Sequence, residues 1–352
     1  MAEWKPLLNA ITSRPVAPEI LSASGVNLSI PSARPGNISL VIPTYNRGDL
    51  IAETIDSALR QELPFAEIIV VDDGSTDDTP AVLARFGDRI KVLRLPNGGV
   101  QRARNTGVAM ASSPWIMLCD SDDLLLPQLN ARLAHWLEAD PACDAIYCNF
   151  VTFAGATEHP DKLSQAPAGF FDGARRSGDV WHDIPDLYAR TVTFQPLFVS
   201  GNVVRKSLYE AIGGFSTGFN GVGGEDWEFT LRLIAHGRVA LCAAPLVRIR
   251  RHAGNDSADS MRQERGCIRI LEHVLQHHPV AAQYREHILR GIDKRRADVF
   301  AAAFAQGDFR LAAQDLAQLR TSPRDLRFRL KALITRLPAA LRTPLWRATQ
   351  AG

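Results

Sequence analysis

The sequence predicts an α/β fold with a doubly wound, mostly parallel sheet and a helical C-terminal extension. Short apolar runs alternate with helical patterns over the first third of the chain, which is typical of parallel strands joined by crossover helices. From about residue 260 the apolar pattern becomes almost entirely helical. The length of 352 residues, with 46% hydrophobic residues, is enough for one large α/β domain with an appendage.

The first half alternates strands and helices in a regular order. The expected strands are Ile38–Val41, Ile68–Val71, Arg89–Leu95 and Pro114–Asp120. A helix is expected after each of them, at about 50–61, 79–86, 98–112 and 127–140. Pro80 suits the first turn of the second helix, where its missing N–H costs nothing. The proline-rich residues 1–36 predict an irregular leader.

The second half changes character. Residues 151–195 are polar and aromatic without periodicity, so we expect irregular structure there. A strand and a short helix are expected within 197–215, and a helix that stops at Gly237 before another strand within 223–242. Two short helices around Gly307 are expected within 301–320. These patterns divide the chain into a leader, a domain over 37–258 and a helical region over 259–352.

Composition excludes several classes of protein. The net charge of +2 gives no sign of a nucleic-acid partner. The five cysteines form no paired motif and their number is odd, so we expect buried thiols in a reducing cytoplasm. The N-terminal residues lack the pattern of a signal peptide, and no apolar run reaches the length of a membrane span. The sequence therefore predicts a cytoplasmic protein.

Three polar clusters, "PTYNR", "DDGSTD" and "DSDD", each follow an expected strand. One such cluster alone is explained by turn and helix-capping residues. Ligands of doubly wound sheets bind at the carboxyl ends of the strands, where all three clusters would meet. They therefore indicate a ligand site. The chain has neither a phosphate-binding P-loop motif nor a glycine-rich dinucleotide motif after its first strand.

The cluster "DSDD" places Asp120, Asp122 and Asp123 directly after the fourth strand. Close carboxylates repel one another unless a cation neutralises them. Mg²⁺ or Mn²⁺ takes oxygen ligands and often binds substrate phosphates at the same time. The alternative is that these residues cap the helix near Pro127, which is the role expected of Asp123.

In order along the chain, "VIPTYNR", "VVDDGSTDDT", "NGGVQRARNTG", "DSDD" and "GGEDWEF" resemble the motifs of inverting nucleotide-sugar glycosyltransferases of family 2, which have the GT-A fold. The resemblance covers about residues 38–257. It implies a nucleotide-binding half over 37–123 and an acceptor and catalytic half over 124–258. It also implies a Mn²⁺ or Mg²⁺ cofactor.

The resemblance assigns the base of the donor to residues after the first two strands. Pro43, Tyr45 and Asp73 would contact it, with Tyr45 stacking on the base and Asp73 accepting from a ring N–H. Asp72 would brace the loop. Asp73 is compatible with uracil or thymine, so UDP is the nucleotide that we expect.

The remaining donor contacts fall on four residues. Arg104 would neutralise donor charge, or else form a structural ion pair with the aspartate clusters. Asp120 would lie near the ribose and Asp122 would bind the metal. His252, in "RIRRHAGNDS", would complete the metal shell or contact the diphosphate, because a neutral imidazole is a competent ligand. A structural role is the alternative for His252.

The motif "GGEDWEF" corresponds to the catalytic acidic motif of the family. Inversion needs a base that removes the proton of the acceptor hydroxyl. Asp226 is the candidate base, with Glu225 second. Asp226 could also be the N-cap of a helix over 227–236, and the two roles are compatible.

The tail from 320 to 348 carries eight Lys or Arg residues and one Asp, interleaved with Leu, Ile, Phe and Trp. A basic amphipathic segment can bind an anionic membrane surface, or it can pack its apolar face on the preceding helices. Membrane contact would place the protein at the inner face of the cytoplasmic membrane and would favour a lipid-linked acceptor.

The sequence therefore predicts a metal-dependent inverting glycosyltransferase that moves a sugar from a nucleoside-diphosphate sugar to a hydroxyl of a glycan or lipid-linked acceptor. Surface polysaccharide, lipopolysaccharide or glycoconjugate synthesis is the expected setting. The alternative is a catalytically silent module that binds a nucleotide sugar or serves as a scaffold. A nucleotidyltransferase is disfavoured because no glycine- and basic-rich triphosphate loop occurs early in the chain.

Overall fold

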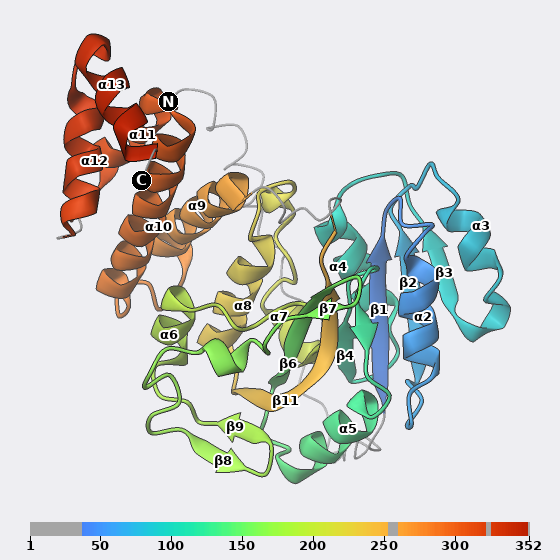
Figure 1. Ribbon diagram of the computed structural model, residues 1–352. Helices are drawn as coiled ribbons and strands as arrows, with labels where there is room; N and C mark the ends of the chain where they lie inside the picture. Colours follow the sequence, from blue (N-terminus) through green and yellow to red (C-terminus); the bar gives the residue numbers. More distant parts are fainter. Residues whose placement is uncertain (1–36, 253–259, 322–324, 351–352) are drawn as a thin grey trace, which may run out of the picture. The chain divides into compact units, whose positions relative to one another are not determined.

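A mixed β-sheet runs through the part of the chain that the structure describes, and helices lie on both of its faces (Figure 1). The structure is a computed structural model that describes residues 37–252, 260–321 and 325–350, so the leader predicted over 1–36 lies outside the described residues. The chain divides into two units, Met1–Ala33 and Arg34–Gly352, and only the second is described below.

The strands of the sheet lie in the order β3-β2-β1-β4-β10-β6-β11-β9-β8, with β5 added to β11 and β7 added to β6. Pairing is parallel through β3, β2, β1 and β4 and again between β6 and β11, whereas β10 runs antiparallel to both of its neighbours. Their bounds are β1 (Ile38–Thr44), β2 (Glu67–Asp72), β3 (Lys91–Arg94), β4 (Trp115–Leu118), β5 (Leu124–Leu125), β6 (Ala145–Ala154), β7 (Thr157–Glu158), β8 (Arg175–Ser177), β9 (Val180–His182), β10 (Asn202–Arg205) and β11 (Val239–Arg250).

Helices connect these strands and continue beyond them. Their bounds are α2 (Ile51–Leu59), α3 (Thr79–Ala84), α4 (Val100–Met110), α5 (Leu129–Ala139), α6 (Leu187–Thr193), α7 (Lys206–Ala211), α8 (Glu225–His236), α9 (Ser260–His277), α10 (Arg285–Gln306), α11 (Phe309–Gln318), α12 (Leu326–Arg336) and α13 (Ala339–Gln350). The predicted strands and helices of residues 38–140 are all present, with ends shifted by a few residues.

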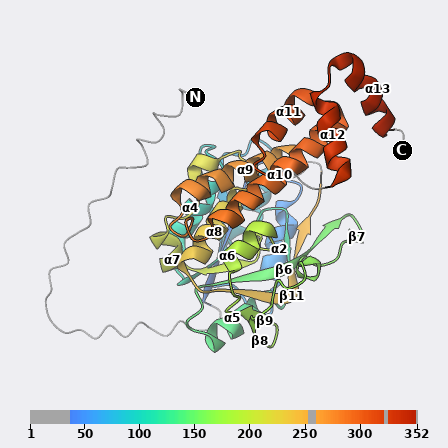
Figure 2. The ribbon, with the colours of Figure 1, turned by 90° about the vertical axis from the view of Figure 1, so that its left-hand side faces the viewer.

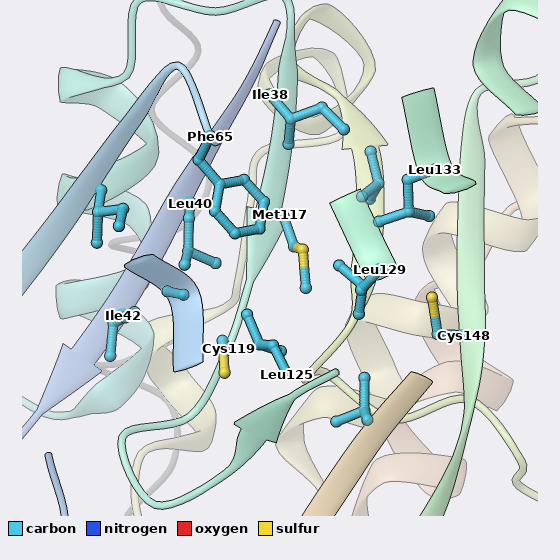
Figure 3. Close-up of a cluster of buried hydrophobic side chains, with 14 of the residues drawn as sticks. Ile38, Leu40, Ile42, Phe65, Met117, Cys119, Leu125, Leu129, Leu133 and Cys148 are labelled. Carbon is cyan, nitrogen blue, oxygen red and sulfur yellow. The ribbon is translucent and has the colours of Figure 1, made fainter. Parts of the chain in front are cut away.

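Side chains of the central strands alternate between two cores, because successive residues of a strand point to opposite faces of the sheet. Leu40 and Ile42 of β1 pack in the core that also contains side chains of α2, α3 and α5. Val41, between them, packs in the core that contains side chains of α4, α7 and α8. Figure 3 shows the first core, with Ile38, Leu40, Ile42, Phe65, Met117, Cys119, Leu125, Leu129, Leu133 and Cys148 labelled. The doubly wound prediction is thereby confirmed.

The prediction that 151–195 is irregular was wrong. β6 begins at Ala145 and pairs with β11 as far as Phe153, and β7, β8, β9 and α6 follow. β6 is buried on both faces, so its apolar residues form an almost continuous run that does not distinguish a strand from a helix. β7, β8 and β9 are two or three residues long, too short for a periodic pattern.

The C-terminal region is helical, as predicted. The predicted break at Gly307 is present: Gly307 has a φ of 76° and ends α10, and Asp308 caps α11 by accepting a hydrogen bond from Leu311 N at 3.0 Å. However, α10 has 22 residues instead of being short. Figure 2 shows α8, α9 and α10 lying side by side, in agreement with their contacts.

The five cysteines are free and buried, as predicted, whereas the reducing compartment stays a prediction. In the part of the chain that the structure describes, no helix has both the length and the apolar composition needed to cross a bilayer.

Candidate active site

The parallel pairing of β1 and β2 brings their carboxyl ends together. Thr44 lies opposite Asp72 in the register, so Tyr45 and Asp73 leave the sheet side by side. The ring of Tyr45 is unusual among the large apolar side chains because it is 45% exposed. An exposed aromatic ring at a strand end is free to stack on a planar base. Pro43 is buried inside β1 and contributes backbone instead of an exposed ring.

Both aspartates of this loop hold backbone groups in place. The carboxylate of Asp72 accepts from Ser75 N at 2.8 Å and lies 3.4 Å from Arg94 Nε. Asp73 Oδ1 accepts from Gly98 N at 3.0 Å, and Asp73 Oδ2 accepts from Gly99 N at 2.7 Å. Asp73 therefore also fixes the start of α4. The sequence predicted that Asp72 supports the loop and that Asp73 contacts the base. The structure shows that Asp73 supports the loop as well.

Asp77, in the second half of the acidic run, has a structural role. Asp77 Oδ1 accepts from Thr79 N at 3.0 Å at the start of α3, and its Oδ2 accepts from Gly48 N at 3.0 Å. Although burial opposes it, these hydrogen bonds lower the pKa of Asp77. The loops after β1 and β2 are thereby tied to each other.

Arg104 of α4 joins the end of β4 to the start of α8. The guanidinium donates to Asp120 Oδ1 at 2.7 Å and lies 3.6 Å from Glu225 Oε1, and it stacks on the ring of Phe215 at 4.9 Å. Arg104 is only 3% exposed. Burial by itself lowers the pKa of Arg104, but the charges of Asp120 and Glu225 outweigh burial and raise it. The structural ion pair considered for Arg104 is therefore present.

Asp122 and His252 lie together although 130 residues separate them. His252 Nε2 is 3.0 Å from Asp122 Oδ2, because β11 ends beside the loop that follows β4. Arg47, after β1, lies 3.5 Å from the same carboxylate oxygen. Three strand ends thus meet at one carboxylate.

These residues fit a divalent cation in part. Within residues 37–252, 260–321 and 325–350, no three His, Cys, Asp or Glu side chains form a group that could hold an ion. Asp122 and His252 nevertheless bring a carboxylate oxygen and an imidazole nitrogen within hydrogen-bonding distance. Mg²⁺ is commonly held by one or two protein ligands, with substrate phosphates and water completing the shell. The pair is chemically suited to that arrangement, with Arg47 as a competing positive charge.

Asp123 does not cap a helix, contrary to the prediction. Its carboxylate accepts from Ser200 Oγ at 2.5 Å and from Arg250 N at 3.0 Å, and α5 starts only at Leu129 without a side-chain cap. Burial, followed by the charges of Asp120 and Asp122, raises the pKa of Asp123 well above its usual range. Asp123 connects the loop after β4 to both halves of the sheet, and neither partner is close enough in sequence to have been foreseen.

The two candidate bases begin α8. Gly224, with a φ of 86°, is the N-cap, so Glu225 and Asp226 occupy the first two helical positions and Asp226 is not the N-cap. Asp226 is partly buried. Burial, followed by the charge of Glu225, raises the pKa of Asp226 to about 7, although Arg104 acts in the opposite direction. A carboxylate with such a pKa can accept a proton near neutral pH.

The loop before α8 is enclosed by residues that the sequence did not point to. On one side, Asn220 lies so close to Gly99 that a Cβ on Gly99 would overlap its side chain. On the other side, Gly266 of α9 lies against the backbone of Gly223, and Arg262 donates to Gly221 O at 2.9 Å. The loop therefore touches the donor-side loop at one end and the C-terminal helices at the other.

A buried ion network fixes α8 to the same helices. Glu228 accepts from Arg232 at 2.8 Å and 2.7 Å and lies 3.3 Å from the imidazole of His278, which follows α9. Burial alone would raise the pKa of Glu228, but hydrogen bonds from His278 and Arg232 lower it to about 2. Gly266 lies within a helical pattern and Glu228 is an isolated glutamate, so the sequence gives no signal for either role.

The chain is similar to glycosyltransferases. Residues 39–189 match the family model described as glycosyl transferase family 2, and residues 195–252 match one described as the N-terminal domain of galactosyltransferase. The chain is 31% identical over 231 residues to the uncharacterized glycosyltransferase YwdF of Bacillus subtilis, covering 63% of this chain and 78% of that protein. It is 32% identical over 224 residues to a validoxylamine A glucosyltransferase of Streptomyces hygroscopicus, covering 57% of this chain and 52% of the relative.

Other relatives match over shorter stretches. The succinoglycan biosynthesis protein ExoO of Rhizobium meliloti is 40% identical over 111 residues, which is 31% of each protein. The chain thus spans a third to a half of the length of several relatives that it matches. Among solved structures, S. aureus TarS 1-349 in complex with UDP-GlcNAc has a TM-score of 0.60 and 17% identity, covering 88% of this chain and 89% of that one. The predicted GT-A-type fold is confirmed by this likeness, whereas the domain bounds of 37–258 stay a prediction.

Proposed function

The chain belongs to glycosyl transferase family 2, and from that premise we propose that it transfers a sugar from a nucleoside-diphosphate sugar to a hydroxyl acceptor with inversion at the anomeric carbon. The observation that carries the proposal is the chain of charges from Asp120 through Arg104 to Glu225 and Asp226. It links the end of β4, where donors bind in doubly wound sheets, to a carboxylate with a raised pKa.

UDP is the nucleotide that we propose. Tyr45 supplies an exposed ring for the base, next to the loop that Asp73 holds. The related fold of TarS was solved with UDP-GlcNAc. Asp120 would lie near the ribose, as the family motif implies, and Arg104 would fix the orientation of its carboxylate.

Asp226 is the proposed general base. As the acceptor oxygen forms its bond to the anomeric carbon, the bond to the diphosphate oxygen breaks and its electron pair leaves with the nucleoside diphosphate. The proton of the acceptor hydroxyl passes to the carboxylate of Asp226. Glu225 forms an ion pair with Arg104. It therefore serves to position the start of α8 and to raise the pKa of Asp226.

A Mn²⁺ or Mg²⁺ ion held by Asp122 and His252 would offset the charge that develops on the diphosphate. Succinoglycan synthesis by a relative supports surface polysaccharide or another glycoconjugate as the product class, with a glycan or lipid-linked acceptor. The cytoplasm, where nucleotide sugars would be supplied, remains the compartment that we propose.

Thermal unfolding with UDP, GDP and dTDP, with and without Mn²⁺, tests the donor site. At a ligand concentration about 100 times the Kd, binding adds about 2.7 kcal/mol to the free energy of unfolding, so the Tm should rise by several degrees. We expect the largest rise with UDP and Mn²⁺, and we expect Asp122→Asn to remove the part that depends on Mn²⁺.

Release of UDP from a panel of UDP-sugars and glycan acceptors then tests turnover. The anomeric configuration of the product, read by NMR, tests inversion. Stabilisation by no nucleotide under either condition would contradict the donor site. Binding without turnover on any acceptor would favour the catalytically silent module instead.

A further inference from the structure

The last two helices expose leucines to an extent seen nowhere else in the described residues. Across the described residues, eight large hydrophobic side chains are exposed, and five of them lie between residues 326 and 345. These five are between 46% and 78% exposed and are Leu326, Leu330, Leu333, Leu341 and Leu345. Single exposed apolar residues are ordinary on protein surfaces, but a cluster within so short a segment marks an interaction surface.

The leucines of α12 share one face of the helix. Leu326, Leu330 and Leu333 have the spacing i, i+4 and i+7, which places them in one stripe. At about 100° per residue, Arg327 falls on one side of the stripe, and Arg329 and Arg336 fall on the other. All three arginines are exposed. This arrangement, an apolar stripe bordered by cations, is typical of helices that lie in a membrane interface.

The exposed stripe is separate from the face that packs inward. Phe328 and Ile334 of α12 are 9% and 3% exposed, and the ring of Phe328 lies 4.7 Å from that of Phe300 in α10. In α13, Trp346 donates from Nε1 to Phe304 O at 2.7 Å. The helices are therefore anchored by other residues, and the leucines are not needed for that packing. The predicted packing of tail residues on the preceding helix is therefore present, whereas membrane contact stays a prediction.

We propose that α12 and α13 bind the surface of an anionic phospholipid bilayer, with the leucines entering the interface and the arginines contacting lipid phosphates. The segment 320–348 carries eight cations and one Asp, so its charge is complementary to anionic headgroups. A second copy of the chain would bring a second set of eight cations to the same surface, and like charges would oppose that contact.

The binding is peripheral. α12 and α13 have 11 and 12 residues, and α13 contains Pro344. Helices of this length are too short to cross a hydrocarbon core but can lie in the plane of the interface. Each Leu that enters the interface and each cation near the surface adds to the affinity, so both kinds of residue matter.

Co-sedimentation of the full chain with vesicles tests the proposal. We expect binding to vesicles of phosphatidylcholine mixed with phosphatidylglycerol, at least about tenfold weaker binding to phosphatidylcholine alone, and loss of binding at high salt. The double variant Leu330→Gln, Leu333→Gln should lower the partition coefficient about tenfold or more. Arg327→Gln with Arg329→Gln should reduce the difference between the two vesicle types.

The matched control is the double variant Val92→Gln, Met110→Gln, which removes two exposed apolar side chains elsewhere on the chain. It should bind vesicles as the wild type does. Equal Tm values for all variants would show that each remains folded. Failure of the wild type to bind anionic vesicles would overturn the proposal. A wild-type dimer in light scattering that Leu330→Gln, Leu333→Gln converts to monomer would assign the stripe to self-association and also overturn it.

Discussion

The two sides of the active site use the same residue type in opposite ways. On the donor side, Asp73 and Asp77 accept hydrogen bonds from backbone N–H groups of neighbouring loops. On the catalytic side, burial and then the charges of Glu225 and Asp120 raise the pKa of Asp226 to about 7. A carboxylate satisfied by backbone donors acts as a brace, whereas one that is buried beside like charges is prepared to take a proton.

Replacing Asp226 should lower turnover more than any other substitution considered below. Asp226→Asn removes the proton acceptor, so we expect turnover to fall about 10²- to 10⁴-fold while the Kd of the nucleotide changes little. Steady-state kinetics with nucleotide binding by calorimetry measures both quantities. A variant that keeps full turnover would show that another group is the base.

The stability of Asp226→Asn provides the control. The raised pKa means that the folded state of the wild type binds more protons than the unfolded state, so stability is lost as pH rises from about 4 to about 7. The Asn variant lacks this loss. Its Tm at pH about 8 should therefore be no lower than that of the wild type. A large drop in Tm would instead indicate misfolding as the cause of lost turnover.

Disrupting the contact between α9 and the loop before α8 should have the next largest effect on turnover. A side chain at Gly266 would overlap the backbone of Gly223, which leads directly into Glu225 and Asp226. We expect Gly266→Val to lower kcat about tenfold or more, because a displacement of about 1 Å can cost up to about a hundredfold, with a smaller change in the KM of the donor.

Gly218→Ala is the matched control for that variant. Gly218 lies in the same loop region, and its nearest neighbour to an added Cβ is Ser216 Oγ at 3.6 Å, an ordinary contact. It should keep the kcat of the wild type. Similar losses in both variants would mean that the loop is sensitive everywhere and that α9 has no special role in positioning it.

Replacing Asp73, which fixes the start of α4, should have the smallest effect on turnover but a clear effect on stability. Asp73→Ala removes the carboxylate to which Gly98 N and Gly99 N both donate, so both part-buried N–H groups lose their acceptor. The free energy of unfolding should fall by about 1–3 kcal/mol, measured by urea denaturation. An unchanged free energy would mean that Asp73 is free to serve the donor alone.

The sequence predicted the donor half of the fold well, because its strands and helices are consecutive and their patterns are local. Tyr45, Asp120, Asp122 and His252 were predicted as site residues because each follows a strand, and strand ends converge. The structure brings Asp122 and His252 together, whereas the roles of all four stay predictions. Contacts between distant segments could not be found in this way. The tie from Asp123 to Ser200 and Arg250, and the approach of Gly266 to Gly223, depend on how β11 and α9 return to the sheet.

The central claim is that Asp226 is a base whose pKa is raised by burial and adjusted in opposite directions by Glu225 and Arg104. The pH dependence of kcat/KM tests it most directly, because this ratio reports the pKa of the essential base in the free enzyme. We expect activity to rise with pH through a midpoint of about 7. Glu225→Gln should move the midpoint down, since it removes a like charge, and Arg104→Gln should move it up. A profile with no rising limb near neutral pH, or one in which neither variant moves the midpoint, would contradict the account.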